Sequence, residues 1–353
     1  MGGRKYLRLF RHAAGATPAD LAFPSAPLPY PEGWFCLGFG HEVGPGRVVT
    51  RRLTGEDVVL ARGASGTLRA LRPHCPHLGA HLGVLGTVSG ERITCGFHRF
   101  EFSLDGPCLR TPYGQPPPRA ALGTLPVRES AGLILVWSGR GGSPPSWEPP
   151  AIPAAGWLRP RGRTFEVAGH PQQMTENVID FGHLEQLHGA TLAKAPEVSF
   201  DGVLCTGRFQ VERKLPRVGP VRVDYAFSVH GLGLTIIDCD LPWAGTTARF
   251  FALPTPVDPW LSRFRFAATA RTGPMGTLAT RLLRDALYTV HAAGSTLDLP
   301  VWQYQKYQRT PRLAPGDGPI GRYRKWAEQF YPTAAADRFE TDLDHRADHQ
   351  RNS

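Results

Sequence analysis

Two short stretches of this 353-residue chain each offer one thiolate and one imidazole, and they constrain its fold more than any other feature. The first is Cys75-Pro76-His77 and the second is Cys95-Gly96-Phe97-His98, with residues 78–94 between them. Two such loops can close on a two-iron cluster, so that one iron takes both sulfurs and the other takes both nitrogens. A structural zinc site is the alternative, but zinc usually pairs CxxC with HxxxH or with another CxxC. The spacing therefore predicts a 2Fe-2S cluster held by Cys75, His77, Cys95 and His98.

The residues around this motif fit a cluster that the backbone approaches closely. Glycine lacks a side chain, so its amide can come near cluster sulfides and donate hydrogen bonds to them. Four glycines lie within or near the motif: Gly79, Gly83, Gly96 and Gly106. Two further histidines, His74 and His81, break the CxH spacing. We interpret His74 as a loop residue and His81 as a residue that either supports a ligand or lies on the surface.

A second group of metal-binding residue types follows in Asp180, His183 and His188. Two imidazoles and one carboxylate on one face of Fe(II) leave positions open for oxygen and substrate. Five residues on a helix rotate by more than about 100°, so both rings reach one ion only if the helix widens or ends near His188. Gly189 suits such an ending. Helical histidine pairs alone are more often ordinary packing. Behind the first motif, this pair predicts a mononuclear iron site.

The carboxylate that completes this site must come from further along the chain, and Asp285 and Asp298 are the candidates. Asp285 lies close to Arg281 and Arg284, which is better explained by a solvated, ion-pairing role. Asp298 stands in the apolar and aromatic stretch 297–302, where little except a metal could neutralise it. We therefore predict that His183, His188 and Asp298 hold the mononuclear Fe(II).

The chain is long enough for two folded domains. Short β-prone runs separated by glycine-containing turns predict that the first is a small antiparallel β domain. A Pro/Gly/Ser-rich stretch over 139–153 makes a natural linker. The predicted boundaries are an irregular arm at 1–28, the cluster domain at 29–140, the linker at 141–156, the iron domain at 157–332 and a disordered tail at 333–353.

Hydrophobic patterns predict the elements within each domain. In the first domain the predicted strands are 47–51, 58–62, 68–71 and 132–137. In the second, a helix is predicted over 172–188 and strands over 203–211, 221–229, 234–241, 247–253 and 262–270. A long helix follows, in which Leu278, Leu282, Ala286 and Val290 recur every four residues. This spacing predicts that these four side chains face the core, with Arg281, Arg284 and Asp285 nearer to solvent.

Composition limits the remaining possibilities. The formal net charge is +10, but the basic residues are mostly arginines scattered along the chain, so no nucleic-acid partner is predicted. A basic face could instead dock an acidic electron-transfer partner. No apolar run approaches the ~20 residues of a membrane span and no export signal is evident, so a cytoplasmic protein without a transmembrane segment is expected. Six cysteines are too few for a disulfide framework, which favours metal ligation or burial.

The first motif and its surroundings resemble the Rieske ferredoxin domain of ring-hydroxylating and steroid oxygenases. The resemblance includes the entry segment Pro31-Glu32-Gly33-Trp34-Phe35 and the string CPHLGA at 75–80. The additional cysteine pair of respiratory Rieske proteins is missing, which implies a low-potential, oxygenase-type cluster. Arg99 departs from the pattern, because the family commonly has glycine after the second histidine; this leaves the local loop conformation open.

Two later segments extend this resemblance. Residues 176–188 resemble the family's iron-site helix, and the resemblance implies catalytic roles for Asn177 and Asp180. Asp180 holds the position that links the mononuclear iron to the Rieske histidine of the neighbouring subunit. Residues 298–331 resemble the C-terminal region of 3-ketosteroid 9α-hydroxylase oxygenases and cholesterol 7-desaturases, which points to a sterol or steroid substrate.

The resemblance implies an α+β fold: an N-terminal antiparallel β Rieske 2Fe-2S domain, then a helix-grip (START-like) catalytic domain with a curved antiparallel sheet and a long C-terminal helix. It implies a homotrimeric oxygenase component that uses O2 to oxidise a C–H bond of a hydrophobic small molecule. No GxGxxG motif follows a strand, so a separate NAD(P)H-dependent reductase, a ferredoxin or both should supply electrons. The alternatives are an aromatic-ring dioxygenase α subunit and a Rieske electron carrier fused to a lipid-binding domain. The presence of His183, His188 and Asp298 argues against the electron carrier.

Overall fold

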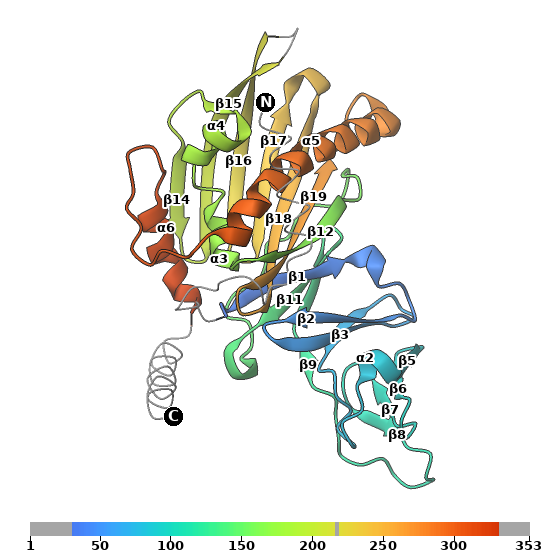
Figure 1. The fold of residues 1–353 in the computed structure, drawn as a ribbon. Helices are drawn as coiled ribbons and strands as arrows, with labels where there is room; N and C mark the ends of the chain where they lie inside the picture. Colours follow the sequence, from blue (N-terminus) through green and yellow to red (C-terminus); the bar gives the residue numbers. More distant parts are fainter. Residues whose placement is uncertain (1–29, 216–218, 332–353) are drawn as a thin grey trace, which may run out of the picture.

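The computed structural model of the protein describes residues 30–215 and 219–331, which form two lobes (Figure 1). The arm predicted for residues 1–28 and the tail predicted for residues 333–353 lie outside the described residues. Across the described ranges, no helix combines the length and the apolar character that crossing a bilayer requires.

The first lobe contains three small antiparallel sheets, with the strand orders β1-β11-β10, β2-β3-β4-β9 and β5-β6-β7-β8. The strands of the first two sheets are β1 (Gly33–Phe39), β2 (Val48–Leu53), β3 (Glu56–Arg62), β4 (Leu68–Leu71), β9 (Thr124–Leu125), β10 (Val127–Ser130) and β11 (Leu133–Ser138). The four predicted strands correspond to β2, β3, β4 and β11, which confirms an antiparallel β domain at this end of the chain.

The third sheet forms the far tip of the first lobe, together with the short helix α2 (Leu82–Leu85) (Figure 1). Its strands are β5 (Gly86–Ser89), β6 (Arg92–Cys95), β7 (Glu101–Ser103) and β8 (Cys108–Arg110). A hydrophobic core shared with β3 and β4 supports the tip, and Ile93 and Phe102 are fully buried in it. This core holds the two Cys/His loops, because Cys75 and Cys95 belong to it.

The second lobe is built on one large, eight-stranded antiparallel sheet in the order β12-β19-β18-β17-β16-β15-β13, with β14 paired to β15. Its strands are β12 (Arg161–Ala168), β13 (Thr191–Leu192), β14 (Glu197–Asp201), β15 (Leu204–Leu215), β16 (Gly219–His230), β17 (Leu234–Leu241), β18 (Thr246–Asp258) and β19 (Leu261–Ala270). The five predicted strands are β15 to β19. Their alternating side chains cover one face, as Tyr225, Phe227 and Val229 do in β16.

The long predicted helix is α5 (Gly276–Tyr304), which lies across one face of this sheet and contacts β12 and β19 (Figure 1). The predicted orientation of the helix is wrong. Leu278, Leu282 and Val290 are 71%, 66% and 56% exposed, whereas Leu283 and Leu287 pack against the core. A four-residue spacing marks one side of a helix but does not say whether that side faces the protein or the solvent.

The single helix predicted over 172–188 is two helices, α3 (Pro171–Glu176) and α4 (Gly182–His188). His170 caps α3, since its Nδ1 accepts a hydrogen bond of 3.1 Å from the Gln172 amide. Between the helices the backbone is held by the C-terminal helix α6 (Ile320–Ala327) and the loop before it. A Cβ on Gly318 would lie 2.3 Å from the Ile179 carbonyl oxygen, so only glycine allows this close contact. The break gives α4 a direction of its own.

The two lobes share a hydrophobic core. Trp34 and Cys36 of β1 pack with Phe251 and Leu253 of β18, and all four are buried. The buried Arg265 of β19 strengthens this contact, because its guanidinium donates to the carbonyl oxygens of Cys36 at 2.6 Å and Leu37 at 3.0 Å. The predicted linker also belongs to this junction, since the Trp34 indole donates to the Trp147 carbonyl at 2.9 Å.

Candidate metal centres and the adjoining cavity

The two loops predicted to hold the cluster have closely similar backbones. The Gly79 amide donates to the Cys75 carbonyl and the Arg99 amide donates to the Cys95 carbonyl, each at 2.9 Å. The fourth residue after each cysteine has a positive φ, 76° at Gly79 and 59° at Arg99. Arg99 therefore takes the left-handed conformation that glycine adopts more easily. With arginine instead of glycine at position 99, the second loop still has the same backbone conformation as the first.

The four predicted cluster ligands lie at the tip of the first lobe as two pairs, Cys75 with Cys95 and His77 with His98. Cys75 and Cys95 point into the core, and burial raises the pKa of the Cys75 thiol, with a further rise from the adjacent Cys95. His77 and His98 lie on the outer side with ring centroids 4.7 Å apart. A buried thiol pair beside a partly exposed imidazole pair is the donor set that a Rieske-type 2Fe-2S cluster requires, so these residues fit that group.

His81 has a structural place beside the cluster loops. It caps α2, because its Nδ1 accepts from the Gly83 amide at 3.2 Å, and its Nε2 lies 3.2 Å from Asp57 Oδ2.

Leu78 and Phe97, one in each loop, are 65% and 56% exposed. The tip therefore presents an apolar surface around the two ligand imidazoles.

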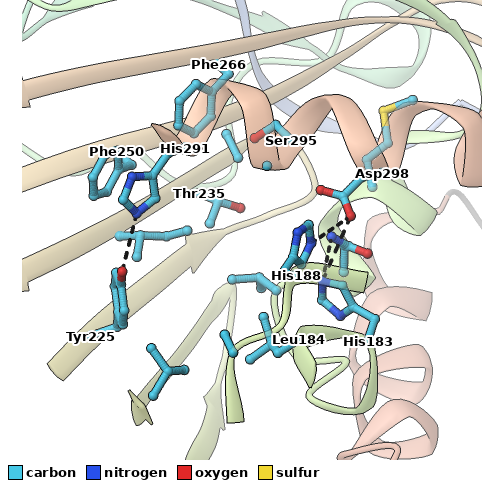
Figure 2. A pocket seen from close by; sticks show the side chains of 18 of the residues that line it. His183, Leu184, His188, Tyr225, Thr235, Phe250, Phe266, His291, Ser295 and Asp298 are labelled. Atoms are coloured by element: carbon cyan, nitrogen blue, oxygen red, sulfur yellow. Dashed lines mark hydrogen bonds and ion pairs between the residues drawn. The ribbon is translucent and has the colours of Figure 1, made fainter. Parts of the chain in front are cut away.

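The residues predicted to hold the mononuclear iron also meet. Asp298 Oδ1 lies 3.1 Å from His188 Nε2 and 4.0 Å from His183 Nε2 (Figure 2). One potential ligand atom from each of the three side chains lies within 4.8 Å of the others, and no other group of three converges in this way within 30–215 and 219–331. As predicted, α4 ends at His188, and Gly189 follows with a φ of 62°.

Hydrogen bonds prepare His183 for metal binding. Its Nδ1 contacts the backbone carbonyl oxygen of Asp180, which can only accept, so Nδ1 carries the proton. Its Nε2 accepts from the Asn177 side-chain amide at 3.3 Å. The imidazole is thus held as the tautomer whose Nε2 carries the lone pair, and a metal would take that lone pair in place of the Asn177 hydrogen bond. A carbonyl partner on the other ring nitrogen orients metal-ligating histidines in the same way.

The two candidate carboxylates differ in their surroundings, as the sequence predicts. Asp298 is 6% exposed, and the ion-pair partners recorded for it are His183 and His188. Asp285 is about one-third exposed and pairs with Arg161 at 3.2 Å and Arg284 at 2.8 Å, which lower the pKa of its carboxyl. A buried carboxylate is stable only with compensating charge. A divalent cation supplies that charge, so the donor set fits Fe(II).

Asp180 lies on the outer side of this site. Burial raises the pKa of its carboxyl, and the adjacent His183 opposes that rise. Its Oδ2 is 3.8 Å from His183 Nδ1, and its side chain remains partly accessible. Asp180 therefore contacts a proposed metal ligand on one side and the surface on the other.

A mainly apolar cavity of about 190 Å³ adjoins the three converging side chains. Its walls come from the sheet face, α4 and α5, and Figure 2 shows His183, His188 and Asp298 at one end. Phe250, Phe264 and Phe266 are among the apolar residues that line it, and the exposed Val290 marks a side open to solvent. The three converging side chains therefore lie next to a cavity in which an apolar ligand would be largely shielded from water.

The fold and these two sites define a class of protein. A Rieske [2Fe-2S] domain matches residues 33–126, so the chain carries a Rieske domain, and its overall fold is that of the Rieske-type oxygenases. The family "3-Ketosteroid 9alpha-hydroxylase C-terminal domain" matches residues 136–331, which is more than half of the chain. The protein belongs to that family.

Individual relatives agree with this assignment. The chain is 28% identical over 337 residues to a cholesterol 7-desaturase of Hemicentrotus pulcherrimus, covering 86% of this chain and 70% of the relative. It is 29% identical over 331 residues to a probable 3-ketosteroid-9-alpha-monooxygenase oxygenase component of Rhodococcus rhodochrous, covering 86% and 81%. The crystal structure of dicamba monooxygenase bound to dicamba has a TM-score of 0.68 at 18% identity, covering 88% and 100%. The Rieske oxygenase fold and the oxidoreductase class are confirmed.

The sequence interpretation missed the polar residues at the other end of the cavity. Tyr225 of β16 and His291 of α5 form a hydrogen-bonded pair there (Figure 2). Neither residue belongs to a local motif, and 66 positions separate them in the chain. The available signal was a histidine within the otherwise ordinary pattern of the long helix, which sequence alone does not distinguish from packing.

Proposed function

We propose that this protein is the oxygenase component of a monooxygenase that uses O2 and external electrons to oxidise a C–H bond of a sterol or steroid. The observation that carries this proposal is the convergence of His183, His188 and Asp298 at the end of an apolar cavity. Supporting it, the chain also carries the two Cys/His loops, and relatives are named as sterol and steroid enzymes.

Each site residue has a role in this proposal. Cys75 and Cys95 hold one iron of the cluster and His77 and His98 hold the other, while His183, His188 and Asp298 hold the mononuclear iron. When bound, these groups supply electron transfer and dioxygen activation. The Asp180 carbonyl fixes the tautomer of His183, and Asn177 fills the space beside its Nε2. The aromatic walls keep water away from the reacting C–H bond.

Assembly into a homotrimer is part of the proposal. The tip formed by α2 and β5 to β8, next to the cluster loops, and the helix α4, which carries His183 and His188, lie at opposite ends of the molecule (Figure 1). This separation favours transfer of electrons between two copies rather than within one. Asp180, partly accessible beside His183, is the residue we assign to that contact. A separate NAD(P)H-dependent reductase, a ferredoxin or both would serve the cluster, since relatives are named as oxygenase components. Six cysteines without disulfides favour the reducing cytoplasm.

The cavity volume supports a second candidate substrate class. An apolar cavity of ~150 Å³ holds benzene, so about 190 Å³ accommodates a small aromatic ring and its substituents. A four-ring sterol must extend through the side marked by Val290. The family favours the sterol, and the enclosed volume favours a small aromatic compound.

Substrate-dependent oxygen uptake tests both candidates. The purified protein, with iron and a compatible reductase, is offered sterols, 3-ketosteroids and small aromatic acids in parallel, and products are identified by mass spectrometry. Oxidation of a sterol or steroid supports the proposal. Turnover confined to aromatic acids overturns the substrate class but leaves the oxygenase activity, whereas no uptake with any of them by fully loaded protein argues against both.

A further inference from the structure

A row of apolar side chains runs along the outer side of α5, the side that faces away from the large sheet. Leu278, Leu282 and Val290 are each more than half exposed, and the exposed Ala286 lies between them. Residues four positions apart share one side of a helix, and twelve positions at 1.5 Å each make this row about 18 Å long. A contiguous exposed apolar surface of this kind marks a place where something binds.

Two larger side chains extend the row beyond the start of the helix. Met275 directly precedes α5 and is partly exposed, and Trp243, in the short turn η4 (Pro242–Ala244), is 74% exposed. The turn lies beside the start of α5, because a Cβ on Gly245 would lie 3.0 Å from Pro274 Cγ. The α5 surface consists of Trp243, Met275, Leu278, Leu282 and Val290.

The charges around the α5 surface are mainly positive. Arg271 and Arg281 are exposed, and within the described residues no ion pair is recorded for either of them. The acidic residue in this half of the helix, Asp285, already pairs with Arg161 and Arg284. An apolar surface with arginines at its edge suits an anionic bilayer, because apolar side chains enter the headgroup region while guanidinium groups bind lipid phosphates. Tryptophan also favours the boundary between hydrocarbon and water.

The α5 surface meets the opening of the cavity. Val290 belongs to both, since it lines the cavity and is 56% exposed. The cavity, at about 190 Å³, does not enclose four rings, so part of a bound sterol would emerge beside Val290. Exposure of that apolar part to water is unfavourable, whereas contact with lipid chains keeps it covered.

We propose that the α5 surface binds an anionic lipid bilayer, and that the substrate passes from the bilayer into the cavity beside Val290 without crossing water. This inference rests on the proposed sterol or steroid function and adds the source from which the substrate is taken. A second copy of the chain fits the surface less well, because a twofold contact brings Arg271 and Arg281 of both copies together. No described helix has the length and apolar character to span a bilayer, so α5 lies along the lipid surface.

The first test measures binding to vesicles by co-sedimentation of the full-length, metal-loaded protein. Vesicles of phosphatidylcholine with phosphatidylglycerol are compared with vesicles of phosphatidylcholine alone. The wild type should bind the anionic vesicles at least about tenfold more tightly, and added salt should weaken this binding. The double variant Leu278→Glu/Leu282→Glu should bind them at least about tenfold more weakly, because two apolar contacts are replaced by carboxylates. Arg281→Gln should weaken the binding about fivefold.

Leu109→Glu is the matched control, because Leu109 is a partly exposed leucine of β8 at the far tip of the other lobe. It should bind vesicles as the wild type does. No vesicle binding by the wild type, unchanged binding by the double variant, or equal loss in Leu109→Glu overturns the inference. A lower molecular mass of the double variant by light scattering, with unchanged vesicle binding, would assign the α5 surface to a contact between copies and overturn it as well.

The second test measures oxygen uptake with cholesterol supplied either in cyclodextrin or in anionic vesicles. The double variant should match the wild type with cyclodextrin and fall at least about tenfold below it with vesicles, since only its contact with the bilayer is changed. Equal turnover of the two proteins with vesicles overturns the inference and leaves the sterol function in place. Vesicle binding without oxidation of any sterol or steroid overturns the proposed function instead, because co-sedimentation requires no turnover.

Discussion

The two metal centres of this chain lie in opposite environments. The cluster loops end in Leu78 and Phe97, which are largely exposed, whereas Asp298 is buried at the end of a cavity. A centre that receives electrons from another protein must lie near the surface, while one that handles oxygen and substrate must limit the access of water. Each lobe is therefore suited to one of these demands, and we expect that mutation can remove one centre without the other.

Removing a cluster ligand should have the largest effect. Cys75→Ser is expected to abolish the visible absorbance of the cluster and all turnover, because one iron loses a thiolate, but to leave the mononuclear iron in place. The wild type should hold about three irons per chain, two in the cluster and one at the mononuclear site. Iron, acid-labile sulfide and the visible spectrum are measured, with Cys108→Ser as the control, because Cys108 is a partly exposed cysteine of β8 at the same tip of the lobe. Zinc in place of iron, without labile sulfide, would end this interpretation.

Removing the buried carboxylate should have the reverse pattern. Asp298→Asn is expected to lose the mononuclear iron and turnover while keeping the cluster spectrum, since it removes the charge that neutralises the metal. Asp285→Asn is the matched control, because it removes a carboxylate from the same helix that pairs only with arginines at the surface. It should keep both centres and cost ~0–1 kcal/mol of stability. Loss of both centres in Asp298→Asn would show that they are not independent.

A change at Asp180 tests the connection between the centres. Asp180→Asn keeps the backbone carbonyl that orients His183 but removes a carboxylate oxygen 3.8 Å from its Nδ1. We expect both metals to be retained and turnover to fall by ~10–100-fold, the usual cost of losing a group that supports a metal ligand. Steady-state oxygen uptake is compared with the iron content of the same sample. Wild-type turnover would remove Asp180 from the proposed electron path.

The smallest effect concerns the large sheet itself. Burial lowers the pKa of His230 from 6.5 to about 4. Below pH 6.5 His230 is therefore protonated in the unfolded chain, whereas in the folded chain it becomes protonated only near pH 4. The stability that is present above pH 6.5 is consequently lost as the pH falls. This loss should reach about 2 kcal/mol at pH 5. Urea unfolding at pH 7 and pH 5 measures it, and His230→Gln, which retains a partner for Ser228, should lose that part of the pH dependence.

The sequence predicts the metal sites better than the packing around them. Cys75, His77, Cys95 and His98 are rare residue types at a demanding spacing, so their grouping could be inferred without coordinates. Asp298 could be chosen over Asp285 because a carboxylate among apolar residues needs compensation. In both cases the chemistry of the residue itself limits where it can lie.

The orientation of α5 and the polar pair could not be predicted in this way. Leu278, Leu282 and Val290 form a regular apolar stripe, yet the sheet contacts the other side of the helix. The break between α3 and α4 depends on Gly318, which lies far along the chain and contacts the Ile179 carbonyl. Tyr225 and His291 likewise meet only because the sheet and the helix pack together. Such features depend on tertiary contacts that no local pattern records.

The core shared by the two lobes has a consequence for modularity. Trp34 and Cys36 lie against Phe251 and Leu253. Arg265, from the other lobe, donates hydrogen bonds to two backbone carbonyl groups of β1. Cutting the chain between the lobes would expose this apolar surface and remove the hydrogen bonds that Arg265 donates to those carbonyl groups. The cluster lobe is therefore not a portable electron-transfer unit, and calorimetry should record one cooperative unfolding transition for the whole chain instead of two independent ones.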